Sequence, residues 1–174
     1  SSRDFVWTVD TIGMELSSIN DVAIISENDV WVVGMFDQKG DDGRYDINKR
    51  GNAAHWDGRR WTIYNITDGT YVGGGELGRA YATGPDNIWF MSSSGIHFDG
   101  THWALKQFFP LGYRVATQSL WISPDNAVRV FVGYDSSIIY FGDGQFIKHP
   151  KAPASDYLSV DGFSNKDVLI GGGY

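Results

Sequence analysis

The sequence predicts an all-β fold assembled from a repeated four-stranded unit, and three observations support this. Glycine accounts for 22 of the 174 residues and aromatic residues for 15%, which is typical of short strands joined by tight turns. No long apolar run interrupts this pattern. The third observation is a recurring order of apolar strand, short turn, second strand ending in Asp-Gly, and aromatic residue opening the next strand. It is clearest at residues 89–103.

The length of the repeat follows from four polar turns that each begin with Ser or Thr. They lie at residues 26–29, 83–87, 123–126 and 164–167. Their starting points are separated by 57, 40 and 41 residues, so the period is near 41, with an insertion of about 16 in the first unit. This period matches one four-stranded blade of a β-propeller. We therefore predict a β-propeller of four-stranded antiparallel blades, here an incomplete segment of about three to four blades.

The same repeat period sets the expected boundaries, and residues 1–174 are expected to form one partial β-propeller. Residues 1–18 are expected to be an outer strand of a preceding or closing blade, because Phe5–Asp10 alternates and resembles residues 61–64. The remaining units are a blade at 19–66 with the insertion at 37–51, a blade at 78–107, a blade at 114–149, and the first half of a further blade at 157–174. We expect remaining blades or another chain to complete the ring.

Each unit contains two strands with distinct expected positions. The strand before each polar turn carries small residues such as Ala23, Ala80 and Ser159, which suit an innermost strand crowded around a central axis. The strand after the turn is apolar on both faces, as expected if neighbouring blades cover both sides. The recurring Trp residues are expected to be core, and core is also the favoured interpretation for Trp7.

The connections between units and the loops between second and third strands share one face of a propeller, which is the natural binding surface. Tyr and Arg are typical of recognition surfaces. Such residues gather near the unit junctions, and the candidate binding residues are Tyr71, Arg79, Tyr113, Arg114 and Tyr157. Scattered surface positions are the alternative interpretation.

The insertion is the candidate metal site. Its carboxylates offer the hard oxygen ligands that Ca²⁺ prefers, and the candidate ligands are Asp37, Asp41, Asp42 and Asp46. Their spacing does not satisfy the EF-hand template, and a solvated surface loop is the alternative. No other cofactor is expected.

His55 and His97 precede Asp57 and Asp99 at equivalent positions, which raises an acid–base or metal role. Recurrence at one repeat position argues for a structural role instead, because equivalent sites on successive blades lie apart. The Asp-Gly pairs are expected to form hairpin turns.

Charge and composition exclude several classes of partner. The formal net charge is −7 and no basic cluster is present, which argues against nucleic acid and anionic membrane surfaces. No apolar segment approaches the ~20 residues needed for membrane insertion. Cysteine is absent, so disulfides, thiol nucleophiles and Cys-ligated metals are excluded.

The pattern Asp-Val-Trp-Val-Val-Gly at 29–34, followed by His-Trp-Asp-Gly-Arg-Arg-Trp at 55–61, resembles the repeats of exported bacterial β-propellers. These occur among Bacteroidetes-type secreted and surface proteins, many of unknown function. The resemblance covers essentially the whole chain. It implies a propeller fold and a secreted or cell-surface bacterial location, with the export signal not present in this chain, and it implies no catalytic residue.

These observations favour a non-enzymatic exported β-propeller that acts as a binding or scaffold module for a protein or glycan. One alternative is a glycan-active hydrolase or lyase with its site on the propeller axis, for which Asp21 and Asp161 are inner-strand candidates. Another alternative is a structural subunit of a surface assembly, joined through an exposed blade edge.

Overall fold

The computed structural model describes residues 7–67, 75–92, 95–106, 117–125, 129–133, 138–142, 145–150, 153 and 155–173. The first sheet contains β1 (Ser18–Ser26), β2 (Asp29–Phe36), β3 (Gly51–Trp56) and β4 (Trp61–Tyr64), with the 3₁₀ turn η1 (Ile47–Lys49) between β2 and β3. The second sheet contains β5 (Arg79–Gly84), β6 (Asn87–Met91), β7 (Gly95–Phe98) and β8 (Trp103–Lys106). The third contains β9 (Thr117–Ile122), β10 (Arg129–Gly133), β11 (Ile138–Gly142) and β12 (Gln145–Lys148). The fourth contains β13 (Asp156–Ser164) and β14 (Asp167–Gly173).

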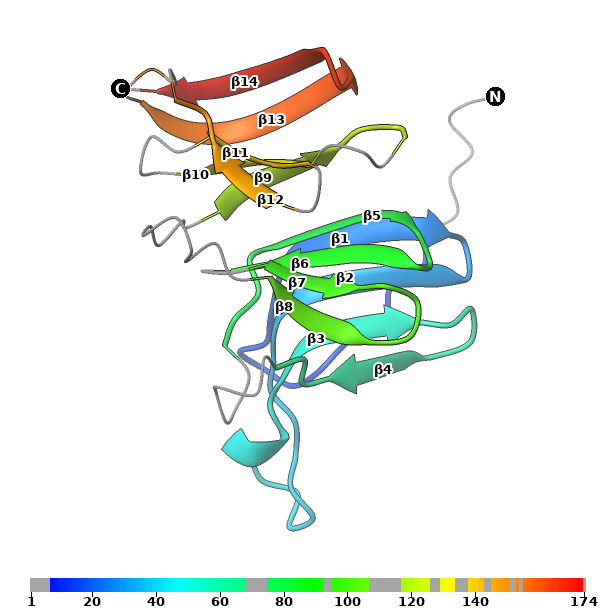
Figure 1. Cartoon of the computed structure of the whole chain (residues 1–174). Helices are drawn as coiled ribbons and strands as arrows, with labels where there is room; N and C mark the ends of the chain where they lie inside the picture. The colour runs from blue at the N-terminus through cyan, green and yellow to red at the C-terminus, as the bar shows by residue number, and fades with distance from the viewer. Residues whose placement is uncertain are drawn as a thin grey trace.

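These sheets are separate and antiparallel, and they follow one another in chain order (Figure 1). A hydrophobic cluster fills each space between consecutive sheets. Trp31 of the first sheet packs with Phe90 of the second, Trp89 of the second packs with Phe131 of the third, and Val130 of the third packs with Val160 of the fourth. Separate small sheets that follow one another in chain order, pack face to face and bring their first strands side by side are arranged as the blades of a propeller. The predicted all-β, incomplete propeller is therefore confirmed.

The middle strands show where blades are covered on both sides. Every residue of β6 is buried, as predicted for a strand between two neighbouring sheets. The same prediction is wrong for β14, where Val168 and Ile170 pack against the third sheet but Leu169 is 62% exposed. The reason is that no described sheet lies on the outer side of β14.

The innermost strands are β1, β5, β9 and β13, and each lies next to the following one. They begin on the side of the sheets where the β2–β3 insertion and the connections between sheets also lie. We call this side the loop face and the opposite side, which carries the turns after β1 and β3, the hairpin face. The side-chain amide of Asn20 links two blades at the loop face, donating to the Leu77 carbonyl at 2.9 Å.

His55 and His97 belong to a repeated structural network. His55 Nε2 lies 2.9 Å from Asp29 Oδ1, and its ring stacks on Trp31 with centroids 4.4 Å apart. His97 Nε2 lies 2.9 Å from Asn87 Oδ1, and its ring stacks on Trp89 at 4.3 Å. Both imidazoles are held by the middle strand of their own blade, so the structural interpretation is confirmed.

The described Asp-Gly pairs form tight turns between the third and fourth strands. Gly58 and Gly100 have φ values of 85° and 93°, which glycine adopts readily. Asp99 Oδ1 accepts hydrogen bonds from the backbone amides of Thr101 at 2.9 Å and His102 at 2.8 Å. Asp57 closes its turn in the same way. The third pair, residues 143–144, lies outside the described residues.

The turn at Asp99 is expected to make stability depend on pH. The pKa of the Asp99 carboxyl lies well below its ordinary value, because the His102 amide and then the Thr101 hydroxyl and amide donate to it. A lowered folded pKa means that the unfolded chain binds more protons. The stabilisation is therefore complete above the unfolded value of about 3.9 and declines as the pH falls towards the folded pKa. Urea denaturation of the wild type and Asp99→Asn should show a stability difference that shrinks on acidification. A pH-independent difference would contradict this account.

The expected N-terminal strand is wrong for residues 7–10, which form no strand. Trp7 is 86% exposed and Val9 92% exposed, so Trp7 is not core either. Alternation alone does not make a strand, because its backbone groups need a neighbouring strand. Instead the segment runs past the first sheet, where Ile12 packs against Val32 and Phe36. Residues 1–6 lie outside the described residues.

Candidate functional site

Three polar residues share one register position on consecutive innermost strands. Asp21 of β1 pairs with Val33, Arg79 of β5 pairs with Met91, and Ser119 of β9 pairs with Val132. Since β1, β5 and β9 follow one another around the axis, the three side chains lie near one another at the loop face. A carboxylate, a guanidinium and a hydroxyl are therefore close together near the propeller axis.

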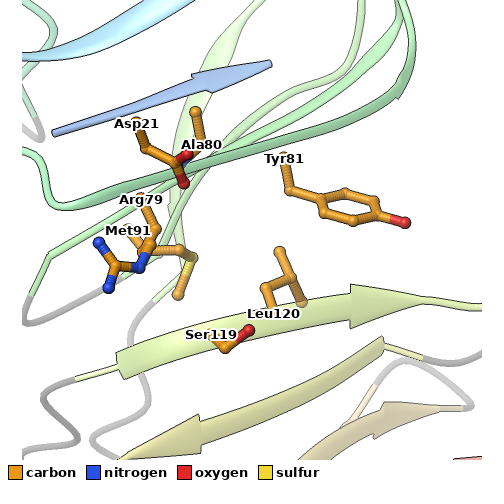
Figure 2. Close-up of a pocket in the computed structure, with 7 residues that line it drawn as sticks. All are labelled: Asp21, Arg79, Ala80, Tyr81, Met91, Ser119 and Leu120. Atoms are coloured by element: carbon orange, nitrogen blue, oxygen red, sulfur yellow. The ribbon is translucent and has the colours of Figure 1, made fainter. Parts of the chain in front are cut away.

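These residues border a pocket of about 150 Å³. Its lining consists of Asp21, Arg79, Ala80, Tyr81, Met91, Ser119 and Leu120, and we call it the hub pocket (Figure 2). Met91 and Leu120 are buried and supply apolar surface, whereas Arg79 is exposed. The pocket thus combines an apolar lining with polar groups from three blades.

Asp21 joins the first two blades. Its Oδ2 accepts a hydrogen bond from the Ala80 amide at 3.1 Å, and its Oδ1 accepts one from the Val22 amide at 2.9 Å. The carboxylate is therefore fixed in place across the interface between β1 and β5.

Arg79 joins the second and third blades in a similar way. Its Nε donates to the Gln118 carbonyl at 2.8 Å, and its Nη1 donates to the Gly78 carbonyl at 3.0 Å. A guanidinium has five N–H donors, and three of them have no acceptor in the part of the chain that the structure describes. Among the described residues no carboxylate lies within ion-pair distance of Arg79. The result is an anchored cation with unused donors.

Tyr81 lies on the side of the pocket towards the later blades. Burial raises the pKa of its phenol, the Asp161 charge raises it further, and the Ile122 amide opposes both. Its hydroxyl therefore stays protonated near neutral pH. Asp161 itself accepts a hydrogen bond from the Gly162 amide at 2.8 Å and does not line the hub pocket. The two carboxylates considered for an axial hydrolase, Asp21 and Asp161, thus do not share this pocket.

The predicted binding residues have different outcomes. Arg79 lies at the hub pocket. Tyr157 is only 6% exposed, because its ring packs among Trp121, Val130 and Val160 and its hydroxyl donates to the Pro153 carbonyl; a surface role for it is wrong. The other three, Tyr71, Tyr113 and Arg114, lie outside the described residues. Sequence reasoning missed Ser119 and treated Asp21 only as a catalytic candidate, and aligning the inner strands by register would have grouped them with Arg79.

The acidic insertion does not gather three of its carboxylates into one site. Asp37 is buried and pairs with Arg50 Nε at 2.7 Å, and Asp41 pairs with Lys49 Nζ at 2.6 Å. Asp42 and Asp46 accept hydrogen bonds from backbone amides within the loop. Within the described ranges no three His, Asp or Glu side chains are grouped as a metal site would require. Calcium binding stays a prediction.

No protein-family model matches the chain, and no curated protein matches it. Solved structures do match. They include the computationally designed Ika4 protein, with a TM-score of 0.60 and 15% identity over 97% of this chain and 93% of that one. The WD40 β-propeller domain of Doa1 matches with a TM-score of 0.59 and 16% identity over 89% of this chain and 48% of that one. YCF48 bound to a D1 peptide matches with a TM-score of 0.51 and 14% identity over 92% of this chain and 62% of that one.

These matches show the β-propeller fold, and at such low identity they show the fold alone. The chain spans about half the length of the Doa1 structure and about three fifths of the YCF48 structure. Among the residues that the structure describes, none forms a helix of the length and apolarity needed to cross a membrane.

Proposed function

We propose that this incomplete β-propeller is a non-enzymatic binding or scaffold module that engages a protein or glycan partner at the hub pocket. The observation that carries the proposal is the shared register of Asp21, Arg79 and Ser119 beside an apolar lining. Ligand pockets typically combine an apolar lining with a few placed polar groups.

Comparison within the repeat supports a binding role at this position. The cross-strand partners of the three polar residues are Val33, Met91 and Val132, all apolar and fully buried. A position that only packs the repeat keeps similar chemistry from blade to blade. The position on the innermost strands instead holds an acid in the first blade, a base in the second and a hydroxyl in the third. Such variation is expected where the residues contact a partner.

A polypeptide is the favoured partner. YCF48, whose fold this chain shares, has been solved with a bound D1 peptide, which provides a precedent for peptide binding on a related fold. Anchored Arg side chains are frequent in such contacts. A glycan is the second class of partner to be tested.

The test is binding of the purified chain to a peptide array and a glycan array, with Arg79→Ala measured in parallel. We expect peptide signals that fall by at least about tenfold in Arg79→Ala, because hydrogen bonds to charged groups contribute about 1.5–3 kcal/mol. Arg59→Ala is the matched control, since it removes the same charge from an exposed residue on the hairpin face. Signals equal in the wild type and Arg79→Ala would overturn the proposal.

Two further parts of the proposal concern the whole protein. We propose export to a bacterial cell surface, which the resemblance of residues 29–34 and 55–61 supports; immunodetection on intact producing cells is the test. We also propose that remaining blades or another chain complete the ring. Phe163 and Leu169 support this, because both are large apolar side chains on the last sheet and are 77% and 62% exposed.

A further inference from the structure

We infer that the ligand of the hub pocket is the carboxyl-terminal end of a polypeptide whose last side chain is apolar, an inference that rests on the proposed function. Three features of the pocket point to it: a fixed guanidinium with unused donors, a neighbouring carboxylate, and a small apolar lining.

The guanidinium of Arg79 selects a carboxylate. The Gln118 and Gly78 carbonyls hold the side chain, so little rotamer entropy remains to be lost when a ligand binds. Its remaining N–H groups form the planar fork that pairs with a carboxylate through two hydrogen bonds. The Ser119 hydroxyl, on the adjacent inner strand, can donate another.

Asp21 makes the pocket favour the carboxylate of a chain end over other anionic ligands. Its negative charge at the same pocket disfavours a phosphate dianion more than a singly charged carboxylate, because the repulsion grows with the charge of the ligand. Each Asp21 oxygen accepts one backbone amide, and a carboxylate has about four acceptor sites. Asp21 can therefore accept one more N–H. The last residue of a polypeptide carries an amide N–H and a carboxylate on the two sides of one Cα, which matches an acid and a base on adjacent strands.

The apolar lining receives the last side chain. The pocket volume of about 150 Å³ equals that of an engineered apolar cavity that accepts benzene, so a branched aliphatic or single-ring side chain fits. Ala80, Met91 and Leu120 contribute aliphatic surface, and Tyr81 contributes its ring. Because Arg79 and Asp21 are taken by the terminal carboxylate and amide, a charged last side chain would lose its hydration here without a compensating partner.

The experiment uses the full chain and two peptide libraries with six randomised C-terminal positions, one ending in a free carboxylate and the other in an amide. Affinities of the selected peptides are then measured by fluorescence polarisation. We expect the free acid to bind at least about tenfold more tightly than the same peptide as an amide. Arg79→Lys should lose most of this preference, because an ammonium lacks the planar fork. Arg59→Ala should keep it.

Three outcomes separate the two proposals. Equal binding of the acid and amide, with affinity still lost in Arg79→Ala, would overturn the inference about the chain end and leave the hub pocket as the binding site. Selection of peptides with charged last residues would also overturn it. Peptide or glycan binding that is unaffected by Arg79→Ala would overturn the proposed function as well. Urea denaturation of each variant confirms that it is folded.

Discussion

Trp89→Ala is expected to lower the free energy of unfolding by about 3–5 kcal/mol, as large-to-small substitutions of buried aromatic residues do. Trp89 is 1% exposed and fills the space between the second and third blades. Its ring packs edge-on against Phe131 with centroids 5.6 Å apart and stacks on His97. Its Nε1 donates to Asn87 Oδ1 at 3.0 Å, so the substitution also removes a buried hydrogen bond.

Urea denaturation followed by circular dichroism measures this loss. Trp7→Ala is the matched control, because it removes the same side chain from a position that is 86% exposed and should change stability by less than about 0.5 kcal/mol. Trp89→Phe keeps most of the packing and should remain folded if Trp89→Ala does not. Similar losses for Trp7→Ala and Trp89→Ala would contradict the packing between blades described above.

Gly34→Ala is expected to destabilise the first blade by about 1–3 kcal/mol or more, because overpacking forces the backbone to move. A Cβ at Gly34 would lie 2.0 Å from the Ser18 carbonyl oxygen, which belongs to the paired inner strand and cannot rotate away. Gly172 on β14 has the same environment, with a Cβ 2.2 Å from the Asp156 oxygen. The requirement for glycine therefore arises from close approach of two strands and not from a positive φ.

The neighbouring Gly171 supplies the control for this prediction. A Cβ there would meet no atom within 4 Å, so Gly171→Ala should be neutral, or stabilising by up to about 1 kcal/mol through the unfolded chain. Gly172→Ala should resemble Gly34→Ala. Thermal or urea unfolding of the three variants distinguishes them, and a neutral Gly34→Ala would show that β1 and β2 can separate without cost.

Local sequence patterns predicted much of the fold, because turns and hairpins are specified by residues that are close together in the chain. The turns at 26–29 and 83–87 and the Asp-Gly pairs each act within a few residues, so they are readable without knowing the neighbours. Their regular spacing then predicts the blade. Patterns of this kind also identified His55 and His97 as structural, since a recurring residue has a recurring neighbour within its own blade.

Exposure was harder to predict, because it depends on what lies beside a strand. Trp7 and Tyr157 are both aromatic residues that lie shortly after a polar stretch of the sequence, yet Trp7 is exposed and Tyr157 is buried. Tyr157 is buried because the third blade supplies Trp121 and Val130 against it. No described strand pairs with residues 7–10, so Trp7 stays outside the core.

By itself, the sequence determined the all-β class, the four-stranded unit and the turns that separate its strands, because each depends on contacts between residues close in the chain. Only the tertiary structure decided the hub pocket. Arg79 follows Asp21 by 58 residues, and Ser119 follows Arg79 by 40. The three meet because β1, β5 and β9 surround one axis, in a register that irregular pairing near Asp21 and Val132 helps to set. That register depends on how whole blades pack, which no short segment specifies.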